Sequence, residues 1–320
     1  MFPAMRRTLV TGALGQIGSE LVVALRQRYG SEAVIASDIR LPPLETLRPG
    51  ERFEFLDSTN ARQIQDIIRN GDVGTVYHLA ALLSATSEEK PHVAWELNMG
   101  GLYKVLEVAR QHDCKVFFPS SIGAFGPGTP KDNTPQDTIQ RPTTMYGVTK
   151  VAGELLCDYY NRRFAVDTRG LRFPGLISYA APPGGGTTDY AVAIFYDAIR
   201  YGRYTCFLKP DTRLDMMYMP DAIDALIGLM EADATKLVHR NSFNVTAMNF
   251  TPTELAAEIR KHIPAFEIRY EIDPVRQGIA DSWPHSLDCS AARAEWGFAP
   301  RYTLEAMVED MLTKLRSRIS

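Results

Sequence analysis

A tyrosine and a lysine lie four positions apart in the segment Tyr146-Gly147-Val148-Thr149-Lys150. On a helix this spacing places both side chains on one face. A cation about 4 Å from a phenol is worth about 4 kcal/mol at an effective dielectric constant near 20, so we expect the lysine to lower the pKa of Tyr146 by roughly three units. The phenolate would then serve as a general base toward a substrate hydroxyl near neutral pH.

The spacing alone is a weak signal, because a chain with 14 tyrosines can place one near a lysine by chance. The context favours chemistry over an ordinary surface pair. Ser120 and Ser121 end a predicted strand, so a hydroxyl is expected at the carboxyl edge of the sheet, where ligands of open α/β folds bind. Asn98, on the helix before that strand, either links Lys150 to a water relay or is a buried polar cap.

A glycine-rich loop, Gly12-Ala13-Leu14-Gly15-Gln16-Ile17-Gly18, follows the first predicted strand and opens a helix. Glycines allow the backbone to approach a pyrophosphate, and the helix start offers free N–H groups to the phosphates. An ordinary strand-to-helix turn is the alternative. Asp38, 20 residues after Gly18 at the end of the second strand, suits the ribose hydroxyls of NAD and disfavours the 2′-phosphate of NADP, although Arg40 weakens that preference. Asp57, after the third strand, either contacts the adenine amino group or, like Ser58, caps a helix.

Strands alternate with amphipathic helices through the first half of the chain, which predicts a Rossmann-type, doubly wound parallel sheet in an α/β fold. The predicted strands are Thr8–Thr11, Ala33–Ser37, Arg52–Leu56, Thr75–Leu79, Lys115–Pro119 and Thr168–Phe173, and the predicted helices are Ile17–Tyr29, Ala61–Arg69, Ala94–His112 and Met145–Phe164.

Gly- and Pro-rich loops follow Pro174, with helices expected at Tyr190–Tyr201, Asp221–Ala232, Thr253–His262 and Leu304–Ser317. We interpret residues 1–175 as an NAD-binding domain and residues 176–320 mainly as a smaller α/β substrate lobe. Residues 220–248 are expected to rejoin the first domain, because Ser242–Val245 resembles a further strand of its sheet.

Composition excludes several kinds of partner. The 320 residues carry a net charge of −3, so no field attracts a polyanion, and no apolar run approaches the roughly 20 residues of a membrane span. We therefore expect no nucleic-acid or membrane partner. The four cysteines and six histidines are scattered and do not have the spacing of metal ligands, so no metal is expected. The cysteine spacing and the short segment Met1–Arg6 before the first strand suit the cytoplasm or a mitochondrial matrix.

Several of these motifs, together with His78-Leu79-Ala80-Ala81, resemble the extended short-chain dehydrogenase/reductase superfamily, which includes the nucleotide-sugar epimerases. The resemblance implies that Tyr146 is the base, that Lys150 binds the nicotinamide ribose and lowers the pKa of the tyrosine, and that Ser121 orients the substrate oxygen. The residues then expected to contact NAD are Gly12, Gly15, Gln16, Ile17, Asp38, Arg40, Asp57, Leu79, Ala80, Ala81, Asn98, Tyr146, Lys150 and Ile177.

Four segments of the second half resemble one branch of that superfamily, the epimerase-like L-threonine 3-dehydrogenases: 171–179, 183–191, 214–222 and 279–284. This resemblance implies oxidation of the threonine β-hydroxyl by NAD to 2-amino-3-oxobutanoate. The residues expected at the substrate are Ser84, Ser121, Tyr146, Thr187, Thr188, Asp189 and Trp283. The superfamily also implies a homodimer formed through helices 94–112 and 145–164, although their apolar residues could face only their own sheet.

Alternatives remain open for several of these residues. The loop before Asp189 offers N–H and hydroxyl donors for a small carboxylate, while Asp189 either faces an ammonium group or caps the next helix. Trp283 is either a lid or simple packing. Arg213 keeps a nucleotide-sugar epimerase or dehydratase as the second hypothesis, since related epimerases use an arginine in this region to bind a nucleotide diphosphate. A non-catalytic NAD sensor is the third.

Overall fold

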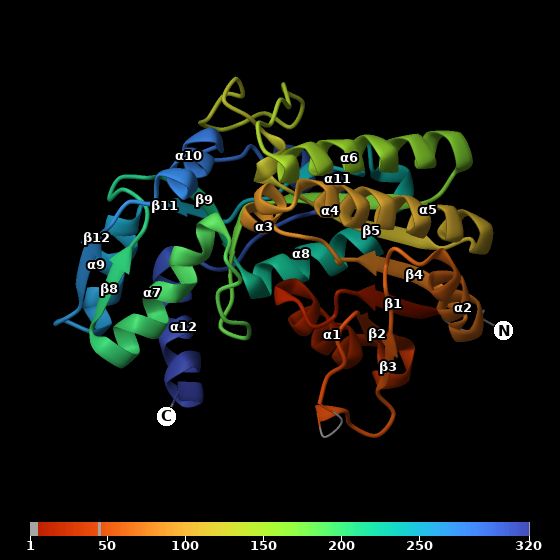
Figure 1. The fold of residues 1–320 in the computed structure, drawn as a ribbon, viewed down its shortest axis with the longest axis horizontal. Coiled ribbons are helices and arrows are strands. Elements are labelled where there is room, and N and C mark those ends of the chain that lie inside the picture. The colour runs from red at the N-terminus through yellow and green to blue at the C-terminus, as the bar shows by residue number, and fades with distance from the viewer. Residues whose placement is uncertain (1–5, 44–45, 320) are drawn as a thin grey trace.

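The computed structural model describes residues 6–43 and 46–319, so most of the segment before the first strand, on which the expectation about targeting partly rests, lies outside the described residues. Seven parallel strands form the main sheet in the order β10-β6-β5-β4-β1-β2-β3 (Figure 1). The six strands predicted in the first half all appear, with ends shifted by at most two residues, which confirms the predicted fold class. The strands are β1 (Arg7–Thr11), β2 (Val34–Asp38), β3 (Arg52–Phe55), β4 (Val73–His78), β5 (Lys115–Ser121), β6 (Thr168–Phe173) and β10 (Phe243–Asn244).

Helices cover both faces of this sheet because successive strand residues point to opposite sides. In β1, Leu9 packs into the apolar cluster beneath α2 (Ala61–Gly71), α5 (Gly101–His112) and α6 (Met145–Phe164). Its neighbour Val10 packs into the cluster beneath α1 (Gln16–Tyr29) and α8 (Met219–Glu231).

The helix predicted over Ala94–His112 is interrupted, which corrects that prediction. The structure has α4 (Pro91–Trp95), then a π-helical turn at Glu96–Gly100, then α5. Asn98 lies in the π turn, and its side chain bonds to both backbone groups of Leu82 and to the Thr149 hydroxyl. A single π turn inside a helix often marks a functional site.

Short elements of the second half gather beside the large sheet (Figure 1). They comprise a three-stranded sheet, a two-stranded sheet and helices around a third apolar cluster. Their bounds are β7 (Gly175–Ile177), β8 (Arg203–Cys206), β9 (Leu214–Tyr218), β11 (Met248–Phe250), β12 (Glu267–Tyr270), α7 (Tyr190–Tyr201), α9 (Pro252–His262), α10 (Pro274–Ser282) and α12 (Leu304–Ile319). Helix α3 (Ser84–Glu89) belongs to the first half, and α11 (Ser290–Trp296) packs into the cluster of α1 and α8. No helix of the described residues is long and apolar enough to cross a membrane.

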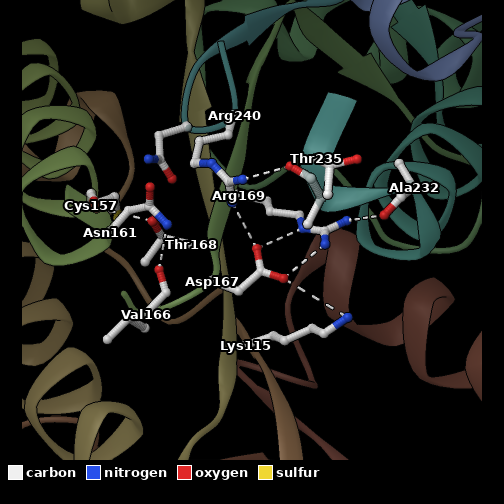
Figure 2. Close-up of polar contacts among 12 residues, drawn as sticks. Lys115, Cys157, Asn161, Val166, Asp167, Thr168, Arg169, Ala232, Thr235 and Arg240 are labelled. Atoms are coloured by element: carbon white, nitrogen blue, oxygen red, sulfur yellow. Dashed lines mark hydrogen bonds and ion pairs between the residues drawn. The ribbon is translucent and has the colours of Figure 1, made fainter. Parts of the chain in front are cut away.

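Two later elements return to the large sheet. Strand β10 pairs in parallel with β6, as the sequence predicted for 242–245, and α8 packs beside α1. A polar cluster at the amino end of β6 connects this strand to the end of α8 and to the segment before β10 (Figure 2). Asp167 receives two hydrogen bonds from the fully buried Arg169 and one from Arg240. Arg169 in turn donates to the carbonyl groups of Leu229 (2.7 Å) and Ala232 (2.8 Å) at the end of α8.

We expect Asp167→Asn to lower the free energy of unfolding by about 3 kcal/mol, because the charge of Arg169 stays buried without a charged partner. Urea denaturation followed by circular dichroism measures this loss. Asp66→Asn, in an exposed pair with Arg69, is the matched control and should cost at most about 0.5 kcal/mol. Equal losses in the two variants would contradict the assigned role of the cluster.

Candidate active site

A cavity of about 140 Å³ opens at the carboxyl edge of the sheet, between the sheet and the second half of the chain. It brings together most of the residues predicted at the nicotinamide and the substrate: Gln16, Ile17, Leu79, Ala81, Ser84, Ser121, Tyr146, Lys150, Thr187, Thr188, Asp189 and Trp283. Further lining residues were not predicted: Leu83, Pro119, Ser120, Ile122, Phe173, Pro174, Gly175, Leu176 and Gly186. Most of these are apolar or small and carry no chemical signature, but four of them, at 173–176, follow directly from the predicted strand end at Phe173.

The start of α6 lies against the turn that follows β5. A Cβ atom on Gly147 would stand 2.2 Å from the Gly123 carbonyl oxygen, and one on Gly123 would stand 3.0 Å from the Tyr146 ring. Gly147 therefore permits a contact that a larger residue would prevent, and a larger residue at Gly123 would crowd the Tyr146 ring. Thr144 caps the helix by accepting a hydrogen bond from the Gly147 N–H (3.1 Å), which fixes the first turn, where Tyr146 lies.

Tyr146 and Ser121 meet across this contact. Both side chains line the cavity beside Gly123, and the Ser121 hydroxyl accepts a hydrogen bond from the Gly123 N–H (3.1 Å). Burial raises the pKa of Tyr146 to about 12, and the neighbouring Ser121 hydroxyl only partly offsets this effect. The predicted lowering of the pKa of Tyr146 is therefore wrong for the protein alone, because desolvation is the largest cause of the shift.

Lys150 is buried one turn further along α6. Its Nζ donates to the Pro119 carbonyl oxygen (2.6 Å) and lies 5.2 Å from the centre of the Tyr146 ring and 5.0 Å from that of Phe118. Burial lowers the pKa of Lys150 to about 8, and the charge of Glu154 opposes that shift. The ammonium group thus sits beside the tyrosine, as the spacing predicted, while its hydrogen bond goes to the backbone of β5.

A second, much smaller cavity lies behind Lys150. His78, Ala80, Asn98 and Lys150 all line it, and its volume of about 10 Å³ is close to that of a single water site. Asn98 makes no direct bond to Lys150, so the predicted relay would need a water here. The alternative, a buried polar cap, describes the bonds that Asn98 makes within the protein.

The glycine-rich loop has the close backbone approach that a dinucleotide requires. Gly12 has φ +68°, and a Cβ atom there would stand 2.9 Å from the Ala80 nitrogen. A Cβ atom on Gly18 would stand 2.2 Å from the Gly12 oxygen. Gly15 precedes α1 without a side-chain cap, which leaves the first N–H groups of the helix to a phosphate. The loop therefore fits a pyrophosphate.

The acids predicted at the adenosine end lie outside the main cavity. Asp38 is buried and accepts hydrogen bonds from the Leu14 N–H (3.1 Å) and from Arg40. A carboxylate has about four acceptor positions, and these three bonds leave about one of them for a ribose hydroxyl. Asp57 accepts from the N–H and hydroxyl of Thr59. Neither Asp57 nor Ser58 caps α2, as the alternative proposed, because Asn60 does.

The loop before α7 supplies the polar wall of the cavity. The Thr187 hydroxyl is buried and has no hydrogen-bond partner among the described residues, so it is available to a ligand. Asp189 accepts from the N–H groups of Gly185 (2.7 Å) and Gly186 (2.8 Å). The Asp189 side chain makes no capping bond to α7, so the capping alternative is wrong, and these two loop N–H groups point at Asp189. Trp283, 5% exposed, also lines the cavity.

Two predicted residues lie elsewhere. Ile177 is fully buried in the third apolar cluster, whereas its neighbour Leu176 lines the cavity. The structure therefore does not bring Ile177 to the predicted cofactor site. Arg213 is not among the residues lining the cavity, and its guanidinium binds Asn249 (2.9 Å) and Glu254 (2.6 Å) near the start of α9.

The fold and site agree with comparisons to known proteins. A model of the NAD dependent epimerase/dehydratase family matches residues 8–245. An uncharacterized epimerase/dehydratase from Staphylococcus haemolyticus is 57% identical over 314 residues, 98% of this chain and 99% of that protein. The structure of L-threonine dehydrogenase from Clostridium difficile is 57% identical, with a TM-score of 0.96 and 99% of each chain covered. A monomeric L-threonine 3-dehydrogenase from a metagenome, in its apo form, is 44% identical, with a TM-score of 0.94 and coverage of 98% of this chain and 100% of that one.

The chain therefore belongs to the NAD-dependent epimerase/dehydratase family. The resemblance of its motifs to the L-threonine dehydrogenases is confirmed by the similar structures. Family and structures together support an NAD-dependent oxidoreductase.

The raised pKa of Tyr146 predicts a late titration of this phenol. Because the neutral form is favoured up to a pH of about 12, replacing Tyr146 by Phe should leave the phenolate absorbance unchanged up to about pH 10 in the protein without ligand. The difference spectrum between wild type and Y146F measures it, with circular dichroism to verify folding at each pH. A phenolate lost near pH 8 in Y146F would contradict the dominance of burial.

Proposed function

We propose that this protein is an NAD-dependent L-threonine 3-dehydrogenase, which oxidises the β-hydroxyl of L-threonine to 2-amino-3-oxobutanoate and forms NADH. The observation that carries the proposal is that Tyr146, Ser121 and Lys150 line one small cavity together with Thr187. The proteins of similar structure named L-threonine dehydrogenases span the whole of this chain.

The proposed reaction assigns one task to each side chain. Ser121 holds the substrate β-oxygen, and Tyr146 takes the proton of that hydroxyl as a general base. Lys150, mostly charged at neutral pH with a pKa of about 8, stabilises the resulting phenolate. When bound, NAD supplies the carbon that accepts the hydride and a positive charge near the phenol.

Tyr146 must lose its proton more easily in the working complex than in the protein alone. Burial opposes the phenolate, so a second positive charge in the cavity is needed beside Lys150. This requirement makes proton removal depend on the oxidised cofactor. The buried carboxylate of Asp38 favours NAD over NADP, since it would repel a 2′-phosphate.

The second hypothesis, a nucleotide-sugar epimerase or dehydratase, is disfavoured by charge. A nucleotide diphosphate needs cationic partners, whereas Lys150 is the one lysine or arginine among the described residues that line the cavity. Arg213, which kept this hypothesis open, is held by Glu254.

Residues 1–175 together with 220–248 are proposed to hold the cofactor, and residues 176–320 mainly to enclose the substrate. The pairing of β10 with β6 supports this division. We further propose a reducing compartment, cytoplasm or mitochondrial matrix, because all four cysteines are buried and unpaired.

Tyr146→Phe is expected to reduce NADH formation from NAD and L-threonine by about 10³-fold or more, because no other group is placed to take the proton. Absorbance at the NADH band measures turnover, and fluorescence titration measures NAD affinity, which should change little. Arg213→Ala is the control and should keep wild-type turnover. Wild-type protein that binds NAD but forms no NADH with L-threonine would overturn the proposal and favour an epimerase or a sensor.

We also propose a homodimer, formed through the outer face of α4, α5 and α6, which lie side by side (Figure 1). Large apolar side chains are exposed on this face: Trp95, Tyr103, Val148, Leu155 and Tyr159, with Leu155 63% exposed. Such a patch is typical of an interface. The similar protein described as monomeric makes this proposal a separate one from the activity.

Light scattering is expected to give twice the chain mass of 35.7 kDa for the wild type at micromolar concentration. Leu155→Glu should shift the mass toward the monomer, because it would bury a charge in the interface. Val238→Glu, at a position 80% exposed elsewhere, should leave the dimer intact. A monomeric wild type would refute the dimer.

A further inference from the structure

Glu154 continues the helix face that carries the proposed catalytic pair. It follows Lys150 by four positions on α6 and is only 4% exposed. Its carboxylate receives hydrogen bonds from Arg172 (3.0 and 2.9 Å) on β6 and from Gln140 (2.9 Å) in the loop before α6. The Ser120 hydroxyl at the end of β5 donates to the same carboxylate. One buried acid therefore joins α6, β5 and β6 directly beside the cavity.

The partner of this acid is equally enclosed. Arg172 is 5% exposed, donates to the Gln136 carbonyl oxygen (2.8 Å) and to Asn244 (3.1 Å), and lies over the Phe125 ring. A buried ion pair of this kind often adds no more stability than apolar residues of the same size. We therefore look for the role of the Glu154–Arg172 pair in how it positions neighbouring residues and in its effect on their charge.

We propose that Glu154 is a positioning residue for the reaction: through Ser120 it holds the Ser121 hydroxyl in register with Tyr146, and it places a carboxylate one helical turn from Lys150. This inference rests on the proposed function of the same site. Ser120 and Ser121 are adjacent at the end of β5, so the bond from Ser120 to Glu154 fixes the backbone from which Ser121 projects. Glu154 itself does not line the cavity, so it acts through its neighbours.

The charges around Lys150 set the sign of the expected effect. From α6 it faces Tyr146 and Glu154, and from β4 it faces His78, whose pKa burial lowers to about 4 and which is therefore neutral near pH 7. Glu154 is the group that raises the pKa of Lys150. Glu154→Gln removes that charge and leaves the cation of Arg172 unpaired, so the pKa of Lys150 should fall.

The test compares Glu154→Gln with Asp167→Asn, which breaks a second ion pair of β6 far from the cavity. Both variants should lose stability. E154Q should lower kcat for NADH formation by about tenfold or more, which corresponds to about 1.4 kcal/mol of transition-state stabilisation, with a smaller change in KM for threonine. Its alkaline limb should move to lower pH, since Lys150 loses its proton earlier. D167N should keep the wild-type kcat and pH profile.

A wild-type kcat and pH profile in E154Q would overturn the proposal, as would an equal change in D167N. Glu154→Asp keeps the charge and should restore the alkaline limb, which a purely structural role would not predict. If E154Q does not fold, Ser120→Ala tests the hydrogen bond alone and should lower kcat, with a smaller loss of stability because Arg172 and Gln140 still bind the carboxylate.

A wild-type enzyme inactive with threonine would refute the proposed function but not this inference. In that case a crystal structure of E154Q decides, because it needs no turnover. A displaced Ser121 hydroxyl would support the proposal, and an unchanged pair of Ser121 and Tyr146 would overturn it.

Discussion

Helix α6 lies directly against strand β5 because three glycines leave no side chain between them. A Cβ atom on Gly153 would stand 2.4 Å from the Phe118 ring, and one on Gly147 would meet the Gly123 carbonyl. This contact brings Tyr146 over Ser121 and lets the Lys150 ammonium reach the backbone of β5. The parallel sheet supplies the edge at which the strands end together. The contact at Gly123, Gly147 and Gly153, here called the glycine seam, sets the distance between the catalytic side chains of α6 and those of β5.

Burial at this seam has an electrostatic consequence. Desolvation disfavours the charged form of each group, so the phenol of Tyr146 keeps its proton while Lys150 becomes easier to deprotonate. The protein alone therefore does not present a ready base. The charge of the buried Glu154 counteracts part of this cost on the lysine. The remaining charge would come with the oxidised cofactor, which couples proton removal to cofactor binding.

Elements with a regular pattern were predictable from the sequence. The alternation of strands and helices predicted the parallel sheet, and the spacing of the motifs predicted that Tyr146, Lys150 and Ser121 lie at its carboxyl edge. Short strands such as β7 and β11 have too few residues to show a period, and the π turn at Asn98 has no sequence signature. The prediction of Ile177 at the cofactor site missed by one position. Adjacent strand residues face opposite sides, and the side chain of Leu176, not that of Ile177, lines the cavity.

The pKa of Tyr146 was mispredicted for a related reason: spacing reports the nearby charge, whereas burial depends on the whole fold. The most direct test of the proposed chemistry follows the transferred hydrogen. With L-threonine carrying deuterium at its β-carbon, we predict NADH that contains one deuterium at C4 of the nicotinamide, as seen by mass spectrometry and NMR. NADH formed without deuterium, or deuterium that stays on the substrate with no NADH released, would contradict the proposed oxidation.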